Sequence, residues 1–240
     1  MKVIDAFWEK RNLGVSTMEI ILEKGDREEE FLKLIDQQEY EYCVVKLPID
    51  AIAFNTVLEK NGFVFAESMN HIYHDLDLKE LNGKKKEIVA NTTIEKAENL
   101  ESIFEQISKG MFSTDRIALD DRFGKEVAAT RYINWIKDEL QRGSEIYKYF
   151  YKGEEFGFSA IKETEVGVYH EFLYGIYNAY AGKGMSVNMP YKLTEVVTEK
   201  GGKMLTTDVS SNNIASLKSK INNGYKFDYS MYVFVKHKNQ

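Results

Sequence analysis

An internal repeat constrains this chain more than any other feature of its sequence. Residues 52–69 align without gaps with residues 214–231, and seven of the 18 positions are identical. Composition alone would give only about one or two identities in such a window. Both segments contain Asn-Gly, a pair typical of a helix that ends before a strand. We therefore expect the N-terminal region to copy the helix–strand end of the C-terminal region.

Several classes of protein are disfavoured by composition. The single cysteine, Cys43, forms no internal disulfide, and with only four histidines a Cys/His zinc site is not expected. The net charge of −6 argues against a nucleic-acid binder. The chain has no apolar run of about 18 residues, so no membrane span is expected. Residues 1–5 do not have the pattern of a signal peptide. We expect a cytoplasmic protein without metal.

A polar segment divides the 240 residues into two unequal parts. Residues 81–86 contain a glycine and three lysines, which is typical of a linker. We therefore expect a smaller domain over residues 1–80 and a larger one over residues 86–240.

Hydrophobic patterning predicts alternating strands and helices in the first part. Strands are expected over residues 18–22, 42–47 and 63–71, and helices over 26–38 and 50–60. Asp50 is the predicted cap of the second helix, and Asn61-Gly62 its end.

The second part is expected to run strand, helix, helix and then mostly strands. Predicted strands cover residues 88–92, 145–151, 155–162, 166–176, 203–209 and 225–236. Predicted helices cover residues 94–108, 124–140, about 186–200 and 212–222, with Lys152-Gly153 as a hairpin turn and Pro190 near the tolerant first turn of its helix.

The most informative segment joins a predicted strand to a helix at residues 176–186. Gly182 and Gly184 allow a tight turn that exposes successive N–H groups before a helix N-terminus, and such a turn suits a pyrophosphate. The glycine spacing matches neither a P-loop nor a dinucleotide fingerprint. A plain glycine turn is the alternative interpretation.

The order of motifs resembles the acetyl-CoA-binding half of the GNAT superfamily of N-acetyltransferases. That pattern is Arg/Gln-x-x-Gly-x-Gly/Ala, a strand, Asn-x-x-Ala/Ser, a helix and Gly-Phe. Gly184 keeps the central glycine, whereas Ala181 and Ser186 depart from the flanking positions. Asn213, Ser216, Gly224 and Tyr225 fit the second block.

The resemblance implies an α+β GNAT fold, with a mixed, mostly antiparallel sheet flanked by helices and preceded by a partial GNAT-like domain. It also implies acetyl-CoA as cosubstrate. The residues it implies for cofactor binding are Tyr174, Ile176, Gly182, Lys183, Gly184, Met185, Ser186, Val187, Asn213 and Ser216.

A second stretch narrows the resemblance. Residues 112–116, 120–123 and 132–136 resemble the N-terminal helices of dTDP-fucosamine N-acetyltransferase and related nucleotide-aminosugar acetyltransferases. Arg116, Asp120 and Asp121 are the candidate substrate contacts, and Arg116, Arg122 and Arg131 could hold phosphates. The alternative is that the aromatic residues are core and the charges form a solvated face.

The resemblance also places the catalytic groups. His170 occupies the position of the family's usual glutamate base, and a histidine can accept a proton near neutral pH. Lys220 stands where the family has a tyrosine acid. Three options follow: Lys220 substitutes, Tyr225 or Tyr191 serves instead, or efficient catalysis is lost.

The sequence therefore predicts acetyl transfer from acetyl-CoA to a primary amine, foremost that of a nucleotide-linked amino sugar. The alternatives are a GNAT enzyme for another small amine, amino acid or peptide, and a CoA-binding protein without turnover. The N-terminal region is expected to buttress the catalytic part. An exposed strand edge makes a homodimer plausible.

Overall fold

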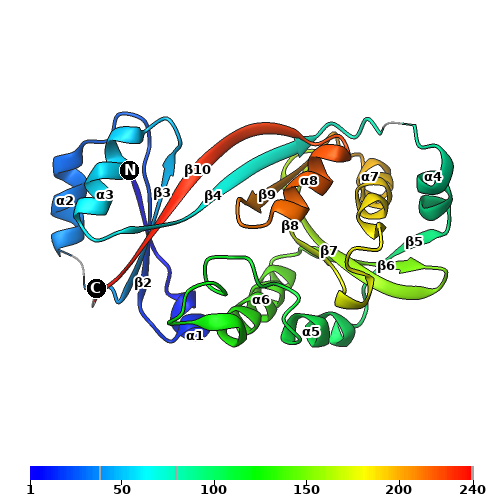
Figure 1. Cartoon of the computed structure of the whole chain (residues 1–240), viewed down its shortest axis with the longest axis horizontal. Coiled ribbons are helices and arrows are strands. Elements are labelled where there is room, and N and C mark those ends of the chain that lie inside the picture. Colours follow the sequence, from blue (N-terminus) through cyan, green and yellow to red (C-terminus); the bar gives the residue numbers. More distant parts are fainter. Residues whose placement is uncertain (38, 79, 239–240) are drawn as a thin grey trace.

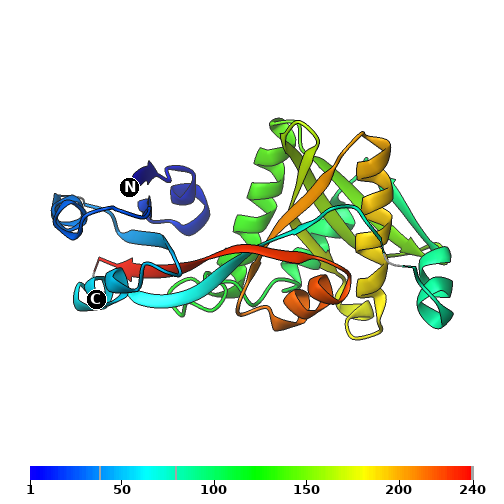
Figure 2. The same ribbon diagram turned by 90° about the horizontal axis from the view of Figure 1, so that it is seen from above.

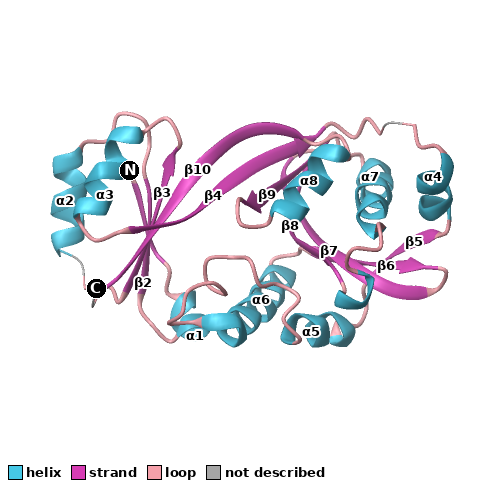
Figure 3. Cartoon of the chain, in the orientation of Figure 1, coloured by secondary structure: helices cyan, strands magenta, loops and turns pink. Residues whose placement is uncertain are grey.

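A single mixed sheet forms the backbone of the molecule. The computed structural model describes residues 1–37, 39–78 and 80–238. Within these residues the strands follow the order β1-β2-β3-β10-β4-β9-β8-β7-β6-β5. Only β2–β3 and β8–β9 are parallel among the described strand pairs. The expected mixed, mostly antiparallel α+β architecture is confirmed (Figure 3).

Strands and helices alternate in the N-terminal part, whereas the C-terminal part has two consecutive helices and then three consecutive strands. The N-terminal elements are β1 (Lys2–Asp5), α1 (Trp8–Leu13), β2 (Thr17–Ile21), α2 (Glu28–Gln37), β3 (Tyr42–Pro48), α3 (Ile52–Lys60) and β4 (Val64–His74). Next come α4 (Gly83–Ala90), β5 (Thr92–Lys96), α5 (Glu101–Ser108), α6 (Gly124–Gln141), β6 (Glu145–Tyr151), β7 (Glu154–Glu165) and β8 (Val168–Ile176). The last are the 3₁₀ turns η1 (Asn178–Tyr180) and η2 (Met185–Val187), then α7 (Asn188–Glu199), β9 (Met204–Ser210), α8 (Ile214–Asn222) and β10 (Lys226–His237).

The sequence repeat corresponds to a repeated unit of structure. The helix–strand pairs α3–β4 and α8–β10 carry the two copies, and their long strands pair with one another antiparallel at the centre of the sheet (Figure 1). Met69 pairs directly with its repeat counterpart Met231. The two copies are therefore related by an approximate two-fold axis through this pair.

Strands β4 and β10 tie the two ends of the molecule together. β4 enters the C-terminal part between β10 and β9, and β10 returns to pair with β3 (Figures 1 and 2). Strands from both sides of the expected boundary thus belong to one sheet. The division into domains 1–80 and 86–240 stays a prediction. The N-terminus and the end of β10 lie at the same end of the molecule (Figure 1).

Apolar helix faces cover the sheet on both sides. Helices α5 and α6 pack on one face of the C-terminal strands and α7 on the other (Figure 2). Helices α2 and α3 bury Phe31 and Leu58 against β2 and β3. A smaller cluster joins the two ends, because Leu13 of α1 and Ala128 of α6 share it with β3 and β10.

Several element predictions were wrong around residues 81–100. Helix α4 lies across the expected linker at 81–86 and the expected strand at 88–92, and the first three residues of the expected helix 94–108 belong to strand β5. The β-branched run at residues 92–94 favours a strand, and β5 pairs antiparallel with β6. Strand β1 and helix α1 were not predicted, and Ala51 rather than Asp50 is the N-cap of α3.

Candidate active site

Strands β8 and β9 separate part-way along their length. They pair only at His170↔Thr206 and the two positions before it. Beyond that point β8 carries a bulge, since Phe172 has no partner in the register with β7. The Thr207 side chain donates to the Glu171 carbonyl oxygen at 2.8 Å instead of continuing the ladder. The far half of β8 is therefore free of its neighbour on this side.

The glycine loop follows directly from this free end of β8. Gly182 and Gly184 have φ of +74° and +79°, which favours glycine, and Gly184 is the N-cap of η2. No backbone carbonyl among the described residues accepts from the N–H of either glycine. Pro190 is the third residue of α7, in the tolerant first turn as predicted. The loop thus leaves both glycine N–H groups, within the described part of the chain, without a backbone acceptor just before η2.

The residues implied for the cofactor surround the same opening. Asn213 caps α8, where its Oδ1 accepts from the Ser216 N–H at 3.1 Å. The Tyr174 hydroxyl hydrogen-bonds the Ser216 hydroxyl and so links β8 to α8. Ile176 is half-buried at the end of β8. Lys183 lies over the Tyr180 ring beside the glycine loop.

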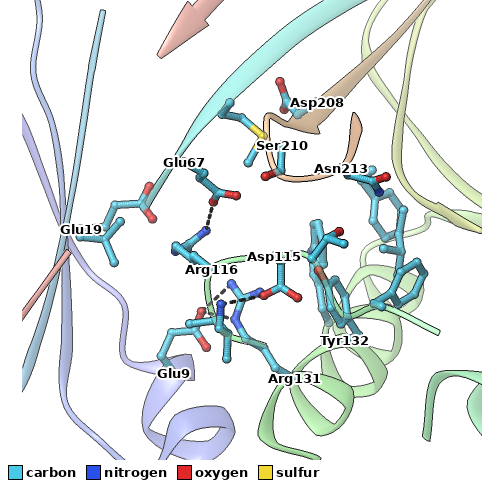
Figure 4. A pocket seen from close by; sticks show the side chains of 18 of the residues that line it. Glu9, Glu19, Glu67, Asp115, Arg116, Arg131, Tyr132, Asp208, Ser210 and Asn213 are labelled. Carbon is cyan, nitrogen blue, oxygen red and sulfur yellow. Dashed lines mark hydrogen bonds and ion pairs between the residues drawn. The ribbon is translucent and has the colours of Figure 1, made fainter. Parts of the chain in front are cut away.

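A cavity of about 420 Å³ lies between the N-terminal strands and the C-terminal part (Figure 4). Its lining comes from α1, β2, β3 and β4 on one side, and from residues 112–117, α6, β8 and β9 on the other. Tyr174, Asn213 and Ser216 also line it, so the cavity meets the opening between β8 and β9.

The cavity wall carries more acidic than basic groups. Five lining carboxylates face three Lys or Arg side chains. Each of the three cations is paired with a carboxylate; the pairs are Arg116–Glu67 at 3.3 Å, Arg131–Glu9 at 2.7 Å and Lys46–Glu19 at 2.7 Å. Asp115 and Asp208 are the lining carboxylates without a described Lys or Arg partner, and Asp208 faces His71 and His170 instead. Among the described residues, Glu67 Oε2 and Asp115 Oδ2 are buried without a hydrogen-bond partner.

His170 lies on the wall where the cavity meets the separated strands. Its Nδ1 is 3.0 Å from Thr206 Oγ1, and its Nε2 is 3.7 Å from Asp208 Oδ2. Burial lowers the pKa of His170, although Asp208 opposes this effect. The imidazole is therefore neutral near pH 7 and able to accept a proton.

Lys220 is a buried residue of α8 and is paired with Glu171, the residue after His170 on β8. Its Nζ contacts Glu171 Oε2 and is 3.9 Å from the centre of the Tyr174 ring. Lys220 and Glu171 are almost fully buried, with side chains 4% and 0% exposed. Burial lowers the pKa of Lys220, and Glu171 opposes this. Lys220 does not line the cavity.

The three predicted substrate contacts are not together. Arg116 lines the cavity. Asp120 accepts from the His237 ring at 2.7 Å, outside the cavity lining, and Asp121 is exposed. Arg122 is also exposed, so the arginine set expected for phosphates does not converge.

Sequence reasoning missed the acidic half of this wall. Glu9, Glu19 and Glu67 come from elements of the N-terminal part, and Asp208 comes from β9. Only the sheet order brings these strands together.

Among the described residues, no group of three or more His, Cys, Asp or Glu side chains could hold a metal ion. Nor does any described helix have the length and apolarity to cross a membrane.

Comparison with known proteins identifies the architecture. No protein-family model and no curated protein sequence matches the chain. A GCN5-related N-acetyltransferase from Sphaerobacter thermophilus superposes with a TM-score of 0.61 at 12% identity, covering 98% of this chain and 75% of that one.

Two further solved structures give similar results. A functionally unknown conserved protein from Staphylococcus epidermidis has a TM-score of 0.59 at 13% identity, with 92% and 84% of the two chains covered. A tandem GNAT protein from the clavulanic acid biosynthesis pathway has a TM-score of 0.57 at 11% identity, with 92% and 75% covered. The chain therefore has the fold of the GCN5-related N-acetyltransferases.

Proposed function

We propose that the protein transfers an acetyl group from acetyl-CoA to a primary amine. One observation carries the proposal. The opening between β8 and β9 has the glycine loop at one end and the acidic cavity at the other. A thioester lying along β8 would thus reach an amine held in the cavity.

The residues around the opening fit acetyl-CoA. The N–H groups of residues 182–187 would receive the pyrophosphate at the start of η2 and α7. The backbone of Tyr174 and Ile176 would pair with the pantetheine amides, since β9 has left this part of β8. The Tyr174–Ser216 contact crosses this path and would have to open on binding.

The bound cosubstrate supplies the activated acetyl group, and the chain supplies acid–base groups. His170 would take the proton from the acceptor ammonium, so that the free amine attacks the carbonyl carbon. Lys220 is the candidate for stabilising the departing thiolate. Its ammonium lies beside Tyr174 and Tyr225, within reach of the opening once the Tyr174–Ser216 contact breaks.

The charge of the cavity supports an acceptor that arrives as an ammonium ion. Asp115 is not paired with any of the three lining cations, so the wall favours a cation over a phosphate. Within this activity we propose an amino sugar as acceptor. If it is nucleotide-linked, its phosphates would lie outside the cavity, because Arg116 and Arg131 are already paired.

A solved neighbour motivates one member of the test panel. The glucosamine N-acetyltransferase region of a fungal β-N-acetylglucosaminidase has a TM-score of 0.57 at 11% identity, covering 80% of this chain and 25% of that one. Glucosamine therefore belongs beside nucleotide-linked amino sugars, polyamines and amino acids.

A second candidate function is acetyl-CoA binding without turnover. The position of the usual tyrosine acid holds Lys220, and that lysine is engaged by Glu171. This reading requires cofactor affinity with no acetyl transfer.

The test is release of the CoA thiol from acetyl-CoA with the amine panel, beside calorimetric binding of acetyl-CoA alone. Release with an amino sugar supports the full proposal. Release only with other amines overturns the sugar assignment, and binding without any release favours the second function. Absence of both binding and release overturns the proposed function.

A further inference from the structure

A cluster of two histidines and one aspartate spans three strands beside the cavity. His71 on β4 and Asp208 on β9 are direct cross-strand partners, and His71 Nδ1 is 2.8 Å from Asp208 Oδ1. The other oxygen of the same carboxylate, Oδ2, is 3.7 Å from His170 Nε2. One carboxylate thus faces two imidazoles.

The rings themselves are also held in place. His71 stacks on His170 with ring centres 6.2 Å apart and planes 10° apart. On its other face His71 stacks on Tyr229 of β10, at 4.7 Å and 16°. A bulge in β10 between Phe227 and Tyr229 accompanies this stack. Three strands therefore position one stack of rings.

We propose that His71 is a positioning residue that sets the proton affinity of His170 through their shared partner Asp208. The inference rests on the proposed function, in which His170 is the base. It also assigns a role at the reaction centre to the N-terminal part of the chain, because His71 belongs to β4.

Four described ionisable groups act on His170: Asp208, His71, Lys162 and Glu171. Asp208 and His71 are the two whose charge is not already balanced by another partner. Lys162 of β7 also faces it but is paired with Glu139 at 3.2 Å, and Glu171 on its own strand is paired with Lys220. The hydrogen bond to Asp208 raises the pKa of His71, with smaller help from the charge of Asp228.

In this proposal a positive charge on His71, held 2.8 Å from Asp208, compensates the charge of that carboxylate before reaction. His170 then stays neutral and can accept a proton. In the reaction one N–H bond of the acceptor ammonium breaks and one N–H bond forms on His170. The new imidazolium faces Asp208, and the proton passes to solvent before the next turnover. Without the His71 charge, Asp208 would hold a proton on His170 at higher pH.

The test uses three full-length variants and does not depend on turnover. The pKa of His170 is measured by NMR titration of its ring proton. That signal is assigned as the one of the four histidine signals that is missing from the spectrum of a His170 variant. His71→Asn keeps a hydrogen-bond donor but removes the charge, and should raise the pKa of His170 by about one unit. Asp208→Asn should lower it, and His71→Arg, which keeps the positive charge, should leave it near the wild-type value.

The same variants give a kinetic result. For an acetylated amine, the acidic limb of the kcat/KM profile should move up in pH for His71→Asn and down for Asp208→Asn. Unchanged midpoints in properly folded variants, or shifts of the same sign, overturn the inference. The failure of the wild type to acetylate any amine overturns the proposed function instead and is visible without the variants.

Discussion

The two ends of this molecule contain the same succession of elements but have different chemistry. Strand β9 (204–210) begins and ends 162 residues after β3 (42–48). Helix α8 (214–222) has the same offset from α3 (52–60). In the N-terminal copy, β2 pairs with β3 at every residue of β2, from Thr17 to Ile21. In the C-terminal copy, β8 leaves β9 after three pairs. The same arrangement of elements thus yields a closed pair at one end and an open site at the other.

The registers identify which residues correspond. Glu19 pairs with Val44 as His170 pairs with Thr206. The cavity-lining pair Glu19–Lys46 therefore corresponds to His170–Asp208. The approximate symmetry places one such pair on each side of the cavity, and only the C-terminal pair contains an imidazole.

The interiors differ in the same way. Glu171 and Lys220 correspond to Ile20 and Leu58, both 0% exposed in the N-terminal core. One copy buries two aliphatic side chains where the other buries an ion pair. The arrangement of elements therefore accommodates an aliphatic pair at these positions and does not require the ion pair.

The largest expected effect tests this difference directly. Lys220→Leu leaves the buried Glu171 carboxylate without its cation and should lower the free energy of unfolding by about 3–5 kcal/mol. The double variant with Glu171→Ile recreates the aliphatic pair of the N-terminal copy and should recover most of that loss. Urea unfolding measures both. A double variant as unstable as the single one would contradict the correspondence.

The next effect concerns catalysis. His170→Asn should lower kcat/KM for acetyl transfer by about 100-fold, since it removes the proposed base. Its counterpart variant, Glu19→Gln, should change kcat/KM by about tenfold at most, through the KM of the amine. Steady-state kinetics with saturating acetyl-CoA measures both. If His170→Asn and Glu19→Gln lowered kcat equally, the proposed assignment of the base to His170 alone would be contradicted.

Much of the fold could be predicted from the sequence, because local signals decided it. Asn61-Gly62 and Asn223-Gly224 mark the ends of α3 and α8, and the glycines have φ of +79° and +95°. The error at Ile94 arose because a β-branched residue within an apolar pattern was assigned to a helix, whereas β5 pairs with β6.

Only the positions of candidate site residues that belong to contiguous motifs could be anticipated from the sequence. The glycine loop and the cap Asn213 are contiguous motifs, and both lie beside the opening. The partners of His170 were not predictable, since Asp208 and His71 are on other strands and meet it only through the sheet order. The ion pair of Lys220 with Glu171 likewise depends on how α8 packs on β8.

A smaller effect separates the two helix starts. Asn213 caps α8, whereas Ala51 at the corresponding position of α3 makes no side-chain cap bond. Asn213→Ala should lower the free energy of unfolding by about 1 kcal/mol, and Ala51→Asn should raise it by about 0.5 kcal/mol. Thermal unfolding of both variants measures this. A gain in stability for Asn213→Ala, or a loss for Ala51→Asn, would contradict the equivalence of the two caps.

The smallest effect is a pH dependence of stability. The pKa of His71 is raised above 6.5, so its contribution is full below pH 6.5 and is lost as pH rises through the raised value. The hydrogen bond from His71 lowers the pKa of Asp208 below 3.8, although burial opposes it, so that contribution is lost as pH falls through the lowered value.

The pair should therefore stabilise the protein most between about pH 4 and 6.5. Since Asp208 is 42% exposed, solvent screening limits the effect to about 0.5 kcal/mol. The measurement is the difference in unfolding free energy between wild type and His71→Asn across pH 4–9. A difference that grows toward pH 9 would contradict the assignment.

Calorimetric titration of acetyl-CoA into wild type, Gly184→Trp and Gly153→Trp tests the central claim most directly. Both glycines have positive φ, +79° and +85°, and open space around the site of a Cβ, so the strain is matched. Gly153 lies in the hairpin turn between β6 and β7, away from the opening between β8 and β9. We expect at least about 100-fold weaker binding for Gly184→Trp only. Equal affinity in all three proteins would contradict a cofactor site at the separated strands.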